Sequence, residues 1–159
     1  MTIRYEAEPE FEYPIDIVVW ASRIYLAHVC NRLLPPAVVE DTIREARLLY
    51  MYDALVRVHD RLLIAATVDI IIHESTCPCS AQHEQALVMA LRFLQQGSRQ
   101  GYTAAMSSVL PDAAVRACTQ DMRLIASGLS DIERYWPKTE GSQDHHAPRP
   151  PVSNVSRLH

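Results

Sequence analysis

No glycine occurs before Gly97, and no proline lies between Pro36 and Pro78. Glycine and proline are the residues that most often interrupt regular structure, so the stretch from Ala37 to about Thr76 predicts one long helix. At about 1.5 Å per residue such a helix would measure roughly 60 Å, which is longer than a compact domain of this size needs. The sequence therefore predicts a helix that either kinks or extends into a dimer.

Part of this stretch also allows a competing interpretation. The segment 62–72 is apolar nearly all round and ends in β-branched residues, among them Val68 and Ile70 to Ile72. Such a run fits a buried strand as well as a buried helix. We expect helix, because a lone strand would find no partner strand elsewhere in this sequence.

Helical periodicity continues on both sides of the long stretch. From Ile15 apolar residues recur every three or four positions until Pro35 and Pro36 end the pattern. Further helices are expected at 81–96, closed by Gly97, then at 102–110 after a short loop, and from Pro111 to Trp136. The buried stripe of the last helix is Val115, Cys118, Met122, Ile125, Leu129, Ile132 and Trp136.

These patterns predict an all-α protein: an antiparallel helical bundle of four to five helices with one long central helix. Residues 1–14 carry Pro9 and Pro14 without helical periodicity and predict a flexible, extended arm. Residues 15–137 form the expected bundle domain. Residues 138–159 are polar and rich in proline, which predicts a disordered tail.

Charge and hydropathy narrow the range of partners. The chain has 15 Lys and Arg against 19 Asp and Glu and no dense basic cluster, which disfavours nucleic acid. The apolar runs are too short or too often interrupted by charge to span a membrane, and the first residues do not resemble a signal peptide. We therefore expect a cytoplasmic protein with reduced thiols, a protein partner and, from its apolar first helix and over-long second one, a homodimer.

The stretch 73–84 concentrates the residues that do chemistry. His73, Cys77, Cys79 and His83 form a palindrome in which each His lies four residues from a Cys and is followed by a Glu. On two helices that meet at Pro78, each His would lie one turn from its Cys and on the same face. Two thiolates and two imidazoles suit tetrahedral zinc, so the four residues are candidate ligands of a structural or sensing metal site.

Three other interpretations of this stretch stay open. The residues can belong to an ordinary turn between helices, leaving a helical interaction module with no ligand. The Cys pair can instead serve a thiol redox enzyme. A bridge between Cys77 and Cys79 would close a very small, strained ring, so this pair is better suited to binding a metal or to redox exchange than to stabilising a fold. His73-Glu74 followed by Cys77 also resembles the HExxH helix of zinc peptidases, with Cys in place of the second His, which would imply a metal-dependent hydrolase with Glu74 as base.

The remaining candidate residues fit structural roles better. We expect Cys118 and Met122 in the core and His59 half-exposed beside Asp60. No catalytic triad can be derived from spacing alone. The sequence therefore favours a non-enzymatic helical regulatory or interaction protein, with zinc bound at a junction between two helices.

Overall fold

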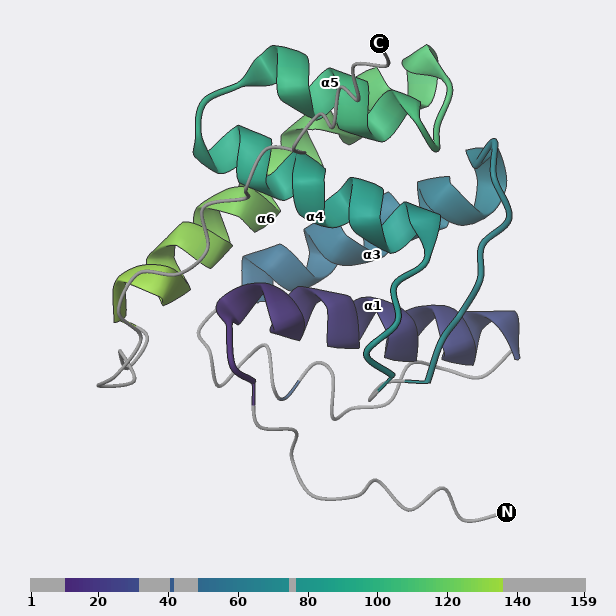
Figure 1. The fold of residues 1–159 in the computed structure, drawn as a ribbon, viewed down its shortest axis with the longest axis horizontal. Coiled ribbons are helices and arrows are strands. Elements are labelled where there is room, and N and C mark those ends of the chain that lie inside the picture. Colours follow the sequence, from purple (N-terminus) through teal and green to yellow (C-terminus); the bar gives the residue numbers. More distant parts are fainter. Residues whose placement is uncertain (1–10, 32–40, 42–48, 75–76, 136–159) are drawn as a thin grey trace, which may run out of the picture.

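The structure, a computed structural model, describes residues 11–31, 41, 49–74 and 77–135 (Figure 1). These residues form five helices and no strand: α1 (Pro14–Cys30), α3 (Leu49–Ala65), α4 (Gln82–Gln95), α5 (Arg99–Ser107) and α6 (Asp112–Tyr135). The all-α prediction is confirmed. Most of the predicted arm and the whole predicted tail lie outside the described residues.

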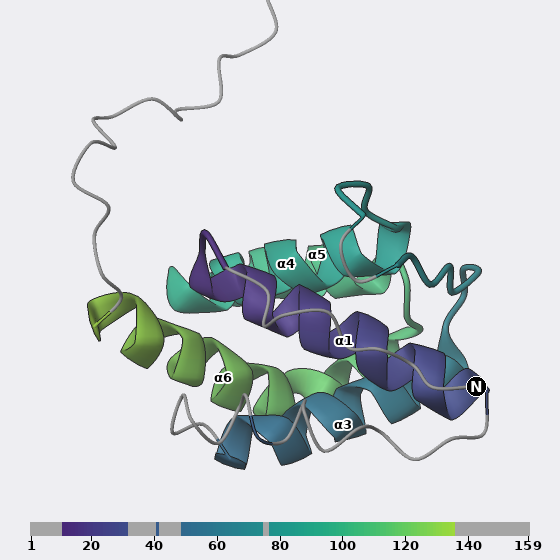
Figure 2. The ribbon, with the colours of Figure 1, turned by 90° about the horizontal axis from the view of Figure 1, so that it is seen from below.

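The helices pack as a bundle in which α6 contacts both α3 and α4. Helices α4 and α5 form a hairpin in which α5 lies on the side of α4 away from α1 (Figure 1). Seen from below in Figure 2, α1 lies between α4 on one side and α3 with α6 on the other. Helix α1 therefore contacts α3, α4 and α6, so its residues can reach both sides of the bundle.

The hydrophobic core follows the periodicity of the sequence. The predicted stripe of α6 is buried from Val115 through Leu129, and Ile132 is partly buried against it. Helix α3 adds a matching face of Met51, Ala54, Leu55, Val58 and Leu62. Cys118 and Met122 are fully buried, as predicted for core residues.

The prediction of one helix running to Thr76 is wrong. Helix α3 ends at Ala65, and the described residues that follow, 66–74, have no regular secondary structure. The N–H of Thr67 leaves the helical pattern and donates to the carbonyl of Val109 before α6, at 2.9 Å. β-Branched residues disfavour helix, so the run from Val68 to Ile72 ends it without glycine or proline. The segment is not a buried strand either, because Ile71 is 55% exposed.

Two glycines make the α4–α5 hairpin possible. Gly97 follows α4 with φ 74°, a left-handed conformation that favours glycine, as the sequence predicted for a helix end. A Cβ on Gly101 would overlap the ring of Phe93, so the absence of a side chain lets the two helices approach closely. The expected loop at 98–101 belongs to the first turn of α5, where Ser98 Oγ accepts the N–H of Gly101 at 3.1 Å.

An ion-pair group joins α3 to α6. The nearly buried carboxylate of Asp121 accepts from Arg57 Nε at 2.9 Å and from Arg61 at 2.5 Å. Burial opposes the charged carboxylate, but these two bonds outweigh it and hold the pKa of Asp121 below its usual value. This contact fixes the layer on which α1 packs.

Candidate metal and thiol site

Arg23 lies in the middle of α1 with its side chain only 6% exposed. Arginine cannot lose its proton in a protein, so a buried guanidinium needs partners for its N–H groups. Trp20, Ala21 and Ile24 surround it in sequence and are all buried. The position of Arg23 therefore obliges some other segment of the chain to supply acceptors.

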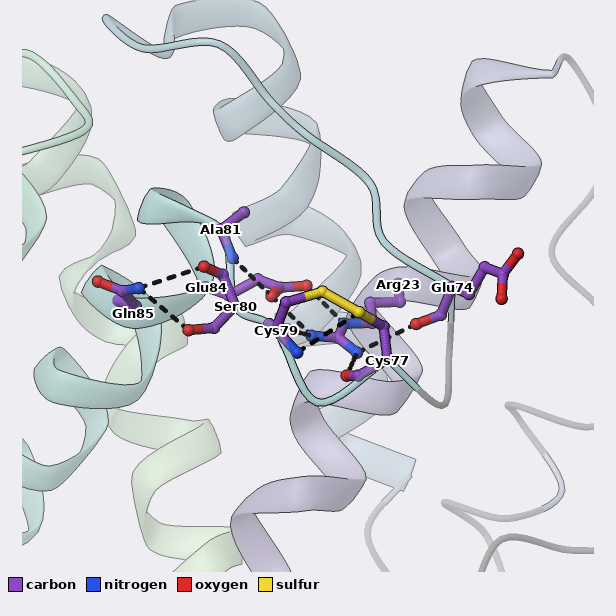
Figure 3. The surroundings of a disulfide bond; sticks show 8 residues. All are labelled: Arg23, Glu74, Cys77, Cys79, Ser80, Ala81, Glu84 and Gln85. Carbon is purple, nitrogen blue, oxygen red and sulfur yellow. Dashed lines mark hydrogen bonds and ion pairs between the residues drawn. A yellow bond between two sulfur atoms is a disulfide. The ribbon is translucent and has the colours of Figure 1, made fainter.

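All five N–H groups of the guanidinium find an acceptor (Figure 3). Nε and NH2 donate to the two carboxylate oxygens of Glu84, at 2.7 and 2.9 Å. The other bonds go to backbone carbonyls of the 74–79 loop: NH1 to Glu74 at 3.1 Å and Cys77 at 2.7 Å, and NH2 to Cys79 at 2.6 Å. One side chain of α1 thus holds both the loop and the start of α4.

Glu84 completes this arrangement from the N-terminus of α4. Its carboxylate also accepts the backbone N–H of Ala81 at 3.0 Å. The N-cap is therefore Ala81, and Glu84 is the third helical residue, in register for the acidic half of a capping box. Burial opposes its charge, but the bonds from Arg23 and Ala81 prevail, so the pKa of Glu84 is lowered.

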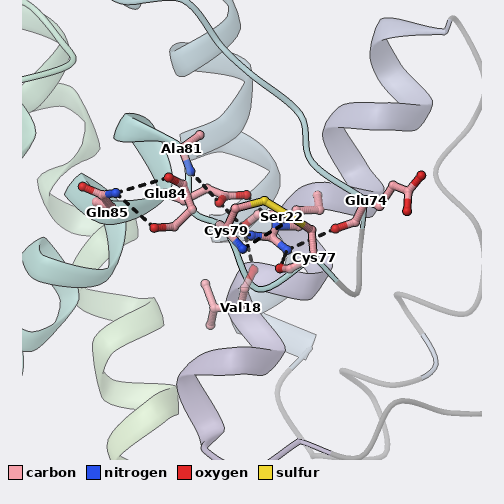
Figure 4. A network of polar contacts seen from close by, with 10 residues as sticks. Val18, Ser22, Glu74, Cys77, Cys79, Ala81, Glu84 and Gln85 are labelled. Carbon is pink, nitrogen blue, oxygen red and sulfur yellow. Dashed lines mark hydrogen bonds and ion pairs between the residues drawn. A yellow bond between two sulfur atoms is a disulfide. The ribbon is translucent and has the colours of Figure 1, made fainter.

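The Arg23 network binds the backbone carbonyls of Cys77 and Cys79 and not their sulfur atoms (Figure 4). Ser22, next to Arg23, takes no part in holding the loop, since its hydroxyl donates to the carbonyl of Val18 within α1 at 2.6 Å. Residues of the loop are therefore fixed by a single side chain of α1.

Cys77 and Cys79 are joined by a disulfide across Pro78 (Figure 3). The expectation of reduced thiols is therefore wrong for this pair: the turn at Pro78 brings the two Cα atoms to 5.4 Å, within bonding range. Cys79 is exposed and Cys77 half-buried, and the N–H of Cys79 points at Cys77 Sγ at 3.4 Å. The other described thiols are separate: Cys30 is exposed, and burial raises the pKa of Cys118.

His73 lies beside the disulfide. Its ring and the two sulfurs offer three possible ligand atoms that all lie within 4.8 Å of one another. The expected helical placement is wrong, because His73, Cys77 and Cys79 all lie outside the helices. Folding of the loop around Arg23 brings them together instead. The trio could hold a metal ion once the disulfide is reduced, because only free thiolates are good ligands.

His83 is the candidate ligand that lies outside this trio. It is the second residue of α4, 2% exposed, and its Nδ1 is buried with no hydrogen-bond partner among the described residues. Burial lowers the pKa of His83, and the nearby charges of His73 and Arg23 act in the same direction. His83 therefore lies buried near His73, and its role as a metal ligand stays a prediction.

Sequence reasoning missed the environment of His59. This residue is fully buried, not half-exposed; its Nδ1 lies 2.7 Å from the carbonyl of Leu55, and its Nε2 has no partner among the described residues. Asp60, its expected neighbour, instead accepts the hydroxyl of Tyr25 at 2.7 Å. Burial lowers the pKa of His59 to about 4, and His83 adds to the effect. The imidazoles of His59 and His83 thus both lie in the interior of the bundle.

The peptidase-like arrangement is not formed. An HExxH site needs both ligands and the catalytic Glu on one helix, whereas 70–74 is not helical and Glu74 is exposed, with its carbonyl bound to Arg23. No helix within the described ranges is long and apolar enough to cross a membrane. The chain matches no family model, no curated protein and no solved structure.

Proposed function

We propose that this chain is a non-enzymatic helical regulatory protein whose reduced His73, Cys77 and Cys79 bind one zinc ion, and whose disulfide state releases it. The observation that carries the proposal is the grouping of three ligand atoms within 4.8 Å. Three ligands of these types are typical of zinc sites, where a fourth donor completes the tetrahedron. His83 is the proposed fourth ligand.

The choice of zinc follows from the ligand types. Thiolates and imidazoles are borderline or soft donors, and zinc accepts both without a preferred geometry of its own. Two thiolates also balance the two charges of the ion. Calcium and magnesium would require oxygen ligands, which the trio does not offer.

The protein would switch between a zinc-bound dithiolate state and a zinc-free disulfide state. In the forward direction the two thiolates lose two electrons to an oxidant of the peroxide or disulfide class, a sulfur–sulfur bond forms, and zinc leaves with its two charges. Reduction by a thiol pair reverses the change. A cytoplasmic location belongs to this proposal, because its thiols keep such a pair reduced until an oxidant is present.

Arg23 connects the cysteine loop to the helices of the bundle. It bonds three carbonyls of the loop and, through Glu84, the first turn of α4. A loop that changes its path on metal binding must therefore shift its bonds to α1 and α4. The proposed output is a change in the surface that those helices offer to a protein partner.

Metal content tests the proposal. The full chain, purified under reducing conditions, should carry about one zinc ion per molecule, and an equivalent of oxidant should remove it. Cys77→Ser with Cys79→Ser should carry none, whereas the matched control Cys30→Ser with Cys118→Ser should keep it. A reduced chain free of metal, with helicity and melting temperature unchanged by zinc, would leave a helical interaction module with no ligand.

A further inference from the structure

The Cys77–Cys79 disulfide also allows a chemistry that needs no metal. We propose that Cys77 and Cys79 exchange disulfide and thiol with substrate thiols, with Cys79 as the attacked sulfur and Arg23 as the positioning residue. The substrate class is a thiol, carried either by a small molecule or by a cysteine of another protein. This activity shares residues with the proposed zinc site and does not depend on it.

The two sulfurs are not equivalent. Cys79 is exposed, whereas Cys77 is half-buried. The N–H of Cys79 points at Cys77 Sγ at 3.4 Å, where it can stabilise negative charge on that sulfur. An incoming thiolate therefore reaches Cys79 more easily, and the bond breaks with the charge on the better-stabilised sulfur of Cys77.

The exchange balances in two steps. A substrate thiolate attacks Cys79 Sγ, a mixed disulfide forms, and Cys77 leaves with the electron pair of the broken bond. A second substrate thiolate then attacks the substrate sulfur of that mixed disulfide and releases Cys79 as a thiolate. Two substrate thiols become one disulfide, the protein becomes a dithiol, and the two thiol protons pass to the protein thiols. The reverse sequence reduces a substrate disulfide.

Arg23 explains why this pair can cycle. Its bonds reach the carbonyls of Cys77 and Cys79 and none of its partners is a sulfur. Opening the sulfur–sulfur bond alone therefore removes no hydrogen bond of Arg23, so in the zinc-free chain the two thiols stay on a backbone that Arg23 holds. Two thiols that the fold holds close together form the disulfide again more readily, because the conformational entropy of bringing them together is already lost on folding.

The cytoplasmic location that belongs to the proposed function gives a further reason. Disulfides that persist in a reducing cytoplasm are rare, and those found there are transient, catalytic or redox-sensing. The Cys77–Cys79 bond also closes a loop of one intervening residue, so it constrains the unfolded chain very little. Stabilisation of the fold is therefore a poor reason for this bond to exist.

Mixed-disulfide trapping tests which sulfur is attacked. In a Cys30→Ser and Cys118→Ser background, Cys77→Ser leaves Cys79 alone and Cys79→Ser leaves Cys77 alone. With oxidised glutathione, and separately with an oxidised two-cysteine peptide, the chain retaining Cys79 should form the mixed adduct about tenfold faster. Equal rates for the two single-cysteine chains would overturn the assignment of Cys79. The two oxidants separate small-molecule from protein substrates.

Redox equilibrium tests the role of Arg23. In the zinc-free full chain, the equilibrium constant for forming the Cys77–Cys79 disulfide with glutathione should be about tenfold larger than in a peptide of residues 75–80. The chain should therefore stay oxidised at glutathione ratios that fully reduce the peptide. Arg23→Lys should move that constant toward the peptide value, whereas the neighbouring control Ser22→Ala should not. Circular dichroism checks that each variant is helical. Should Arg23→Lys unfold, Glu84→Gln, which weakens the hold on Arg23, should give the smaller shift in the same direction.

The outcomes separate this proposal from the zinc proposal. Exchange faster than that of the peptide in a chain that binds no zinc supports exchange alone. A different result would overturn the exchange proposal and support only the metal site. In that result the chain binds zinc, but its disulfide exchanges no faster than that of the peptide and has the same equilibrium constant.

Discussion

The guanidinium of Arg23 and the carboxylate of Glu84 form a two-pronged ion pair, at 2.7 and 2.9 Å, with side chains only 6% and 3% exposed. The two residues are 61 positions apart in the sequence. Their pairing holds the cysteine loop between α1 and α4. The candidate site therefore depends on a long-range contact rather than on the local helical spacing of its ligands.

Replacing Arg23 with Met should destabilise the protein strongly. The change leaves Glu84 as a buried charge without its partner and frees three loop carbonyls, and breaking such a pair costs about 3–5 kcal/mol. Urea unfolding measures the free energy of unfolding. The matched control is Arg92→Met, because the Arg92–Glu133 pair is about one-third exposed and should contribute at most about 1 kcal/mol. Equal losses for the two variants would contradict a special role for Arg23.

Stability should fall as the pH drops from about 6.5 to about 4. Burial lowers the pKa of His59 from 6.5 to about 4, so the unfolded chain takes up a proton before the folded one does. The stability contributed by neutral His59 is fully present above pH 6.5 and is lost through that window, by up to about 3 kcal/mol.

Urea unfolding across that pH range checks the prediction. His83 shifts in the same direction and shares the effect, whereas the lowered pKa values of Glu84 and Asp121 place their losses at lower pH. His59→Leu should flatten the curve. A wild-type slope of zero between pH 4.5 and 6.5 would contradict buried neutral histidines.

Homodimer formation stays a prediction, with a changed basis. The over-long helix that suggested it is not present beyond Ala65, but Ile64 is 85% exposed and Ile71 is 55% exposed. Light scattering should give twice the chain mass. Ile64→Glu with Ile71→Glu should give a monomer with unchanged helicity, because charge cannot be buried in an apolar contact. A wild-type chain that is monomeric at high concentration would exclude the dimer.

The predictable part of the fold is the part governed by periodicity. The apolar stripe of α6 and the glycine that ends α4 locate those helices directly. The end of α3 is less visible in sequence, because neither glycine nor proline marks it and the deciding contact, Thr67 to Val109, joins distant residues. The β-branched residues from Val68 onward were the sequence signal for the end of α3. The absence of a partner strand argues against a strand, but it does not make such a run helical.

The candidate site was predictable in its residue types but not in its geometry. Spacing suggested two helices with a His one turn from each Cys, whereas a loop wrapped on Arg23 gathers His73, Cys77 and Cys79. Arg23 was the overlooked signal. A charge among Trp20, Ala21 and Ile24 on an apolar helix must either reach solvent or find a buried partner, and sequence alone does not identify which carboxylate that partner is.

Cobalt(II) titration tests the central claim most directly. Cobalt takes the place of zinc in thiolate sites and becomes strongly coloured when sulfur binds it. The reduced Cys30→Ser and Cys118→Ser chain should bind one cobalt with tetrahedral, thiolate-bound absorption, and one equivalent of peroxide should abolish it as the Cys77–Cys79 disulfide forms. A reduced chain that binds no cobalt through sulfur, or one that keeps its cobalt after the disulfide has formed, would contradict the claim.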